Sequence, residues 1–202
     1  MLILKYISMM SVIMPFAFAL MWKVDRHGYK VRALIVFMLV AQAADSILFF
    51  SESELRNSFY HIYTVLEYSV FSFLFFTWEN EHEQRTGLII ILGFAAIMIC
   101  ELVESGIDKS GMFIESIVLF LLSARLFLKI SSYHFSFFLT SDMRFWFSLS
   151  CLIYFGINTI SFPLINHRFM QSVHAVNNIL FSLLITTGFV CRQLHSMHYR
   201  LP

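Results

Sequence analysis

Seven long hydrophobic stretches run through this chain, and they constrain its fold more than any other feature. We expect helices at about residues 5–22, 33–51, 58–78, 87–105, 112–130, 145–165 and 170–191. A helix that crosses about 30 Å of hydrocarbon needs about 20 mostly apolar residues, which is close to the length of each stretch. Charged residues make up 13% of the chain, whereas a soluble domain usually carries about 25%. The sequence therefore predicts an all-α fold, a polytopic transmembrane bundle of seven helices that forms a single domain over residues 1–202.

The distribution of Lys and Arg predicts the orientation of this bundle, because cytoplasmic loops carry the excess of these residues. One set of alternating loops holds only Lys5, Arg56, Lys109 and Arg168. The other set is richer and holds Lys23, Arg26, Lys30, Arg32, Arg85, Lys129, Arg144, Arg192 and Arg200. The N-terminus is then expected outside and the C-terminus in the cytoplasm, in a multi-pass protein of the cell inner membrane.

Prolines and glycines indicate where the helices end or bend. Gly87, Gly106 and Gly111 fall where helix ends are expected, and Pro163 should kink or stop the sixth helix. Pro15 lies inside the first helix, which a membrane helix tolerates when neighbouring groups re-satisfy the freed carbonyl. The same stretch contains Ala17-Phe18-Ala19, which resembles the cleavage site of a signal peptide. Cleavage there would leave six helices with the same orientation.

Ionisable and amide side chains from five of the stretches fall toward the outer side of the membrane. A helix rises about 1.5 Å per residue, so the depth of each residue follows from its place in its stretch. Because charged groups inside a bilayer are costly, such a gathering indicates a functional site. The residues that we expect to line one polar pocket are Asp45, Tyr63, Glu67, Glu115, Tyr154, Asn158, His174, Asn177 and Asn178.

Several interpretations of this pocket remain open. Hydrogen bonds among the amides and tyrosines would hold the bundle together. A pocket that opens to the outer side would sense or transport a small polar ligand or ion, which is the interpretation we favour. A membrane-embedded lipid hydrolase, with or without a metal, would use histidine and carboxylates as ligands or as acid and base. An oligomeric pore would need a polar stripe along a whole helix, and whether the chain is an enzyme stays open.

Composition and motifs narrow the expected partners. The formal net charge of +1 gives no reason to expect nucleic acid. The chain contains no HExxH or GxSxG motif, and His174 is the one histidine well placed for the pocket, so we expect no metal and no cofactor. Cys100, Cys151 and Cys191 form no CxxC motif and are expected to be buried free thiols. The expected partners are the lipid bilayer and a small polar ligand or ion, and the sequence is compatible with a homo-oligomer.

The string His61-Ile62-Tyr63-Thr64-Val65-Leu66-Glu67-Tyr68 resembles an HxYTxxEF-like signature of small seven-helix integral membrane proteins common in Bacteroidetes. Other segments look like further recurring pieces of that family: Ala44-Asp45-Ser46, Glu115-Ser116, Phe145-Trp146 with Tyr154 and Asn158, and His174 through Asn178 to Gly188-Phe189. In the last of these the family often reads HNxxNxxxN, and this chain departs from it with His174-Ala175-Val176-Asn177-Asn178. The resemblance implies the fold and the set of residues, and it implies no reaction.

Overall fold

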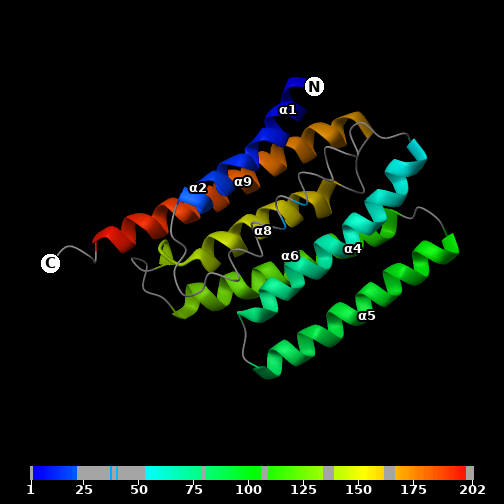
Figure 1. Ribbon diagram of the computed structural model, residues 1–202. Coiled ribbons are helices and arrows are strands. Elements are labelled where there is room, and N and C mark those ends of the chain that lie inside the picture. Colours follow the sequence, from blue (N-terminus) through cyan, green and yellow to red (C-terminus); the bar gives the residue numbers. More distant parts are fainter. Residues whose placement is uncertain are drawn as a thin grey trace. The chain divides into compact units, whose positions relative to one another are not determined.

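The computed structural model describes residues 2–21, 37, 40, 53–78, 81–105, 109–133, 139–161 and 167–198. All regular structure in these ranges is helical (Figure 1), which confirms the predicted all-α class for them. The chain divides into two compact units. Unit 1 consists of Met1–Arg26 with Phe120–Pro202, and unit 2 consists of His27–Leu119. The second predicted helix, at 33–51, lies outside the described residues except for Phe37 and Val40.

The described part of unit 1 contains α1 (Leu2–Ser11), α2 (Ile13–Met21), the later part of α6 (Lys109–Tyr133), α8 (Met143–Ser161) and α9 (His167–His198). The long α9 lies along α8, and both α1 and α2 pack on α9 (Figure 1). Near the end of α1 the Ser11 hydroxyl donates to the Ser8 carbonyl at 2.7 Å and lies 3.2 Å from the Ser182 hydroxyl of α9. Within unit 1, α9 is therefore the helix that α1, α2 and α8 all contact.

The first predicted helix contains a one-residue turn at Val12. α1 ends at Ser11, Val12 forms a turn, and α2 begins at Ile13. Pro15 has no N–H group to donate to the Ser11 carbonyl, and its ring crowds that carbonyl, so the helical hydrogen bonds stop at this point. The first expected helix is thus present, divided into α1 and α2 by this turn, and Pro15 lies inside α2. α8 is described as far as Ser161, and the predicted effect of Pro163 lies outside the described residues.

Unit 2 contains α4 (Ser53–Thr77), α5 (Glu81–Ser105) and the first part of α6 (Lys109–Tyr133). α4 packs on α5. Gly87 lies inside α5 and not at a helix end as predicted, because α5 begins at Glu81 in a charged segment of good helix formers. The Phe76 ring of α4 occupies the space where a Cβ on Gly87 would stand. Gly87 thus allows a close approach of the two helices.

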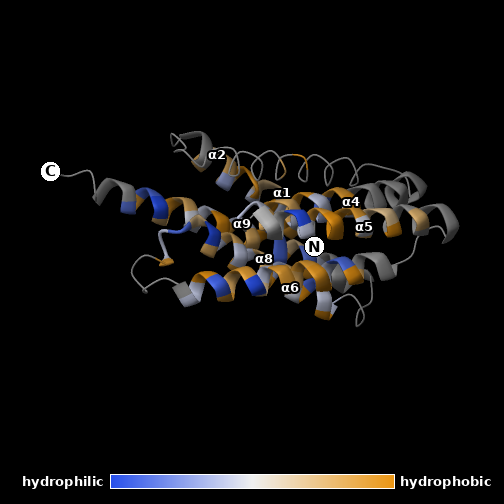
Figure 2. Cartoon of the chain, turned by 90° about the horizontal axis from the view of Figure 1, so that it is seen from below, coloured by the Kyte–Doolittle hydropathy of each residue, from blue (hydrophilic) through white to orange (hydrophobic). Residues whose placement is uncertain are grey.

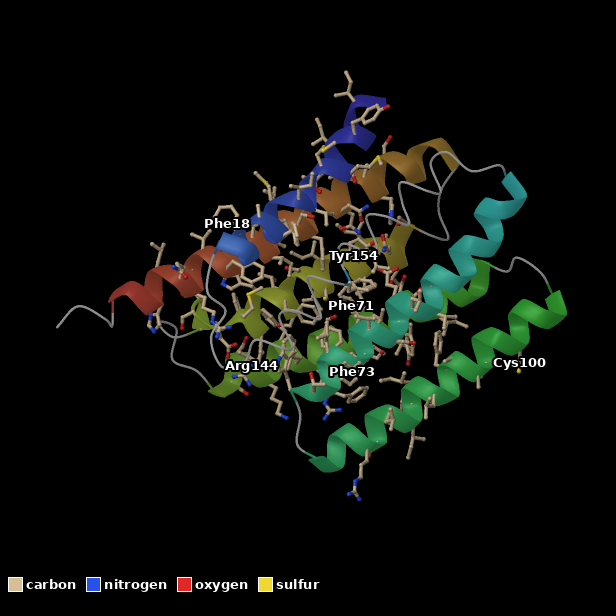
Figure 3. The ribbon with its side chains drawn as sticks, viewed as in Figure 1. Phe18, Phe71, Phe73, Cys100, Arg144 and Tyr154 are labelled. Atoms are coloured by element: carbon tan, nitrogen blue, oxygen red, sulfur yellow. The ribbon has the colours of Figure 1, made fainter. Side chains whose placement is uncertain are left out.

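Apolar side chains cover much of the outside of the described helices. On α5, Leu88, Ile89, Ile90 and Leu92 are all exposed, Ile89 by 72%, and the helix is largely orange in the hydropathy view of Figure 2. Cys100 on the same helix is exposed as well (Figure 3), so the prediction that it is buried is wrong. The reason is that the described residues of α5 bury little besides one narrow face.

One helix in the described part of the chain is long and apolar enough to cross a membrane, Ser172–His195 within α9. Shorter apolar helical segments lie at Tyr6–Phe18, Thr64–Thr77 and Arg85–Ile97. The described residues thus show a helical chain with one segment of spanning length and three shorter apolar ones.

Candidate functional site

A stripe of buried side chains runs along one face of α4 and carries the first part of the site. Glu67, Tyr68, Phe71 and Ser72 recur at the three- and four-residue spacing that places side chains on one helix face. All four are buried, Glu67 with 9% of its surface exposed and Tyr68 and Ser72 with none. Phe73, one residue farther, is 51% exposed and projects from the other side of the helix (Figure 3). α4 therefore turns the Glu67 carboxyl group and the Tyr68 and Ser72 hydroxyls inward.

Glu115 lies in the part of α6 that belongs to unit 2, and it is buried with 4% of its surface exposed. The charge of Glu67 acts on Glu115, so the two carboxyl groups lie within electrostatic reach of each other. Glu115 also acts on the Tyr68 hydroxyl. Two helices far apart in the sequence thus bring a pair of carboxyl groups and a phenol into one buried region of unit 2.

Glu115 Oε1 is buried without a hydrogen-bond partner among the described residues. The buried hydroxyls of Tyr68 and Ser72 have no partner in good hydrogen-bond geometry there, but they lie close enough to interact with each other. The two hydroxyls lie one turn apart on α4, and the Tyr68 ring is held against Phe94 of α5 with the ring centroids 4.0 Å apart. A buried polar group without a partner costs about 1–3 kcal/mol, so native structures rarely keep one. We call Glu67, Glu115, Tyr68 and Ser72 the carboxylate cluster.

The oxygen atoms of the carboxylate cluster define what it can do chemically. Carboxylate and hydroxyl oxygens are hard ligands that suit protons, alkali and alkaline-earth cations and hydrogen-bonding molecules. Among the described residues no three His, Cys, Asp or Glu side chains gather closely enough to hold a metal ion. The expectation that the chain binds no metal stays a prediction.

A second polar group, in unit 1, joins α9 to α8 through Asn177. Its Nδ2 donates to the backbone carbonyl of Tyr154 at 2.8 Å and to Asn158 Oδ1 at 3.0 Å. Asn177 has 1% of its surface exposed, and its own Oδ1 has no hydrogen-bond partner among the described residues. We call Asn177, Asn158 and Tyr154 the amide cluster. Its contacts are interhelical hydrogen bonds, so it serves at least to fix α8 against α9.

The other two polar residues at the start of α9 have less buried positions. His174 is exposed, and its ring centroid lies 6.1 Å from that of Tyr154, while Asn178 is partly buried. Successive residues of a helix are about 100° apart, so Asn177 and Asn178 cannot both point at the centre of one interface. Of the two asparagines and His174, Asn177 is the one buried against α8.

The sequence-predicted pocket residues therefore fall into two sets, each described within its own unit. Glu67 and Glu115 come together in unit 2, and Tyr154, Asn158, His174, Asn177 and Asn178 lie near one another on α8 and α9 in unit 1. Asp45 and the Tyr63 side chain lie outside the described residues. The sequence interpretation missed Tyr68 and Ser72 as site residues. The sequence could have indicated them, because they follow Glu67 by one and five residues and so extend the same helix face onto the next turn.

No protein-family model, no curated protein and no solved structure matches this chain. The fold and the two clusters therefore carry the functional conclusion by themselves. What they define is a helical chain with exposed aliphatic faces and two buried carboxyl groups, of which Glu115 has an oxygen without a hydrogen-bond partner among the described residues.

Proposed function

We propose that this chain is a polytopic integral membrane protein that binds a small polar ligand or ion at Glu67 and Glu115, for sensing or transport. The observation that carries the proposal is the buried carboxyl pair with its unpartnered Glu115 oxygen. An unpaired buried charge costs several kcal/mol, and acidic groups kept inside membrane helices commonly mark ion and substrate pathways. A ligand that pairs with the Glu115 oxygen would remove this cost.

The exposed and buried surfaces of the helices support a lipid environment. Aliphatic side chains such as Ile89, Leu121, Leu128 and Ile160 are each at least 60% exposed, whereas carboxyl, amide and hydroxyl groups are among the buried side chains. In water, polar side chains would be favoured on the outside and aliphatic ones inside. A bilayer favours aliphatic side chains on the outside, because its hydrocarbon is as apolar as leucine. With 58% hydrophobic residues, the chain fits the seven-helix bundle of the inner membrane expected from its sequence.

Cysteine labelling tests the proposed topology. In a chain whose native cysteines are replaced, His27→Cys and Asp108→Cys are exposed separately to a membrane-impermeant maleimide in intact cells. We expect position 108 to react from the periplasm and position 27 to react only after the cells are permeabilised. The reverse pattern would overturn the orientation, and recovery of the protein in the soluble fraction would overturn the membrane assignment.

Reaction with dicyclohexylcarbodiimide tests the site, because this apolar reagent modifies protonated carboxyl groups in apolar surroundings. Purified protein in detergent should acquire one adduct, mapped to Glu115 by peptide mass spectrometry and absent from Glu115→Gln. Asp142→Asn is the matched control, since Asp142 pairs with Arg144 at the start of α8 and asparagine remains a good N-cap there. If wild type and Glu115→Gln give the same adduct pattern, the carboxyl pair is not a reactive site and the proposal fails.

A further inference from the structure

We infer that the end of unit 1 at which α6 and α9 end and α8 begins binds the phosphate group of an anionic phospholipid. This surface belongs to a different unit from the carboxylate cluster, and the inference rests on the proposed membrane location. Three cationic side chains from three helices define the surface, and we call them the basic end: Lys129 of α6, Arg144 of α8 and Arg192 of α9.

The charged residues are divided very unevenly between the two units. The sequence of unit 1 contains nine Lys and Arg residues against two Asp and no Glu, whereas unit 2 contains five against eleven Asp and Glu. From Ser116 to the end of the sequence the only acidic residue is Asp142, whose carboxylate pairs with Arg144 at 2.7 Å. A single carboxylate balances one cation, whatever else it contacts. Unit 1 therefore carries an excess of positive charge, which is complementary to a phosphate group.

A contact between aromatic rings places Lys129 near the start of α8. The Phe127 ring of α6 lies 5.5 Å from the Phe145 ring of α8, measured between centroids. Lys129 follows Phe127 by two residues, and Arg144 directly precedes Phe145 at the start of α8 (Figure 3). Because a helix rises about 1.5 Å per residue, both cations lie within about 3 Å of this contact along their helix axes. The end of α6 and the start of α8 thus bring two cations to the same level.

The packing of α9 on α8 brings Arg192 to the same end. Asn177 of α9 bonds to Asn158 of α8, whereas a Cβ on Gly188 would lie 2.7 Å from the Cβ of Trp146. Higher residue numbers in α9 thus face lower ones in α8, so the two helices run antiparallel. Arg192 follows Gly188 by four residues, or about 6 Å along the helix axis. It therefore lies level with the first turn of α8, which carries the second cation of the basic end.

Apolar side chains beside the cations favour a lipid over a dissolved anion. Leu128, next to Lys129, is 67% exposed, and Leu194, two residues after Arg192, is 57% exposed. The Trp146 indole donates its N–H to a backbone carbonyl at 2.7 Å, and tryptophan is typical of the level of lipid headgroups. A phospholipid matches both kinds of surface, because its phosphate meets the cations and its acyl chains cover the leucines. A free phosphate would contact the cations alone.

Quenching of Trp146 fluorescence by brominated lipids tests the basic end. The sequence contains three Trp residues, so Trp22→Phe with Trp78→Phe leaves Trp146 as the one indole. Full-length protein is reconstituted in phosphatidylcholine vesicles with a minor fraction of one brominated lipid. We expect brominated phosphatidylglycerol to quench Trp146 more strongly than the same fraction of brominated phosphatidylcholine. Native mass spectrometry of the wild-type protein with a mixture of the two lipids should show the same preference.

Charge substitutions identify the side chains that hold the phosphate. Lys129→Gln and Arg192→Gln should each lower the preference for phosphatidylglycerol about fivefold, the usual contribution of one cation near an anionic surface. Asp142→Asn should raise the preference, because it makes the basic end more positive. Arg85→Gln is the matched control, since Arg85 is exposed on α5 of the acidic unit 2, and it should leave the preference unchanged. Sodium chloride should weaken the preference of the wild type by screening.

Three outcomes would overturn the inference. Equal quenching by the two brominated lipids, with no preference in the mass spectra of the wild type, would show that no anionic phospholipid binds there. Equal losses on Arg85→Gln and Arg192→Gln would assign the preference to the overall charge of the surface. Displacement of the lipid by sodium phosphate, at an ionic strength at which sodium chloride displaces none, would identify a site for dissolved anions. These results leave carbodiimide labelling of Glu115 unaffected, whereas recovery of the protein in the soluble fraction would remove both proposals together.

Discussion

Replacing Gly87 by alanine should destabilise unit 2, because the Phe76 ring already occupies the position of the added methyl group. The contact involves Cγ and both Cδ atoms of the ring, which stand near the base of the side chain and cannot swing away as a flexible tip would. Adding a methylene to a well-packed interior typically costs about 1–3 kcal/mol. The two helices must separate or the ring must leave its rotamer.

Gly93 provides the control within the same helix, since a Cβ there would meet no atom within 4 Å. Alanine is favoured over glycine inside a helix by about 1 kcal/mol, and both substitutions receive this gain. The difference between Gly87→Ala and Gly93→Ala therefore isolates the steric cost, and we expect it to be about 1–3 kcal/mol. For a chain of this size each kcal/mol corresponds to a shift of about 2–4 °C in Tm.

The assay is reversible unfolding in mixed micelles with a rising fraction of dodecyl sulfate, followed by far-ultraviolet circular dichroism. Gly93→Ala should unfold at the same or a higher fraction of denaturing detergent than wild type, and Gly87→Ala at a lower one. Phe76→Leu should relieve much of the cost of Gly87→Ala in a double-mutant cycle. Equal stabilisation by both glycine substitutions would show that α4 and α5 do not approach each other at Gly87, and would refute the packing described above.

Two further predictions concern unit 1 and use the same assay. Asn177→Ala removes two hydrogen bonds from α9 to α8, and at about 0.6 kcal/mol for each it should cost about 1.2 kcal/mol. A double-mutant cycle with Asn158→Ala should recover about 0.6 kcal/mol of coupling, and a coupling of zero would contradict the bond. Gly188→Ala places its methyl 2.7 Å from the Cβ of Trp146 and should cost about 1–3 kcal/mol. Gly156→Ala, whose nearest contact is at 3.2 Å, should cost less, and the opposite order would contradict the packing of α9 on α8.

Hydrophobicity predicted where the described helices lie better than where they end. The third and fourth expected helices began at residues 58 and 87, whereas α4 begins at Ser53 and α5 at Glu81. The missing turns are polar segments rich in Glu, Gln and Arg, which have high helix propensity but add nothing to an apolar run. The break after Ser11 went unpredicted because Pro15 is compatible with either a tolerated kink or an interruption.

The candidate site was partly predictable for a related physical reason. Glu67 and Glu115 stood out because ionisable residues within apolar stretches are costly, and both are indeed buried in unit 2. Tyr68 and Ser72 are common residues in apolar helices, so their identity alone did not mark them as site residues. Only their position on the same helix face as Glu67 indicated a place in the site. Helix phase also distinguishes buried Asn177 from exposed His174. His174 and Asn177 are three residues apart, a spacing that also fits two residues on the same broad helix face. The sequence alone therefore did not show which of the two is buried.

The hydrogen bonds of Asn177 have a consequence for how homologous chains should vary. One acceptor is the backbone carbonyl of position 154, which every amino acid possesses, and the other is the side chain of Asn158. As far as these bonds are concerned, position 154 is free to change without compensation at 177. Positions 158 and 177 are not free to change independently. An apolar residue at either position removes the side-chain hydrogen-bond partner of the amide group at the other. Among relatives, substitutions at 158 and 177 should therefore occur in pairs, with amide or hydroxyl residues replaced together by apolar ones, while position 154 varies independently of both.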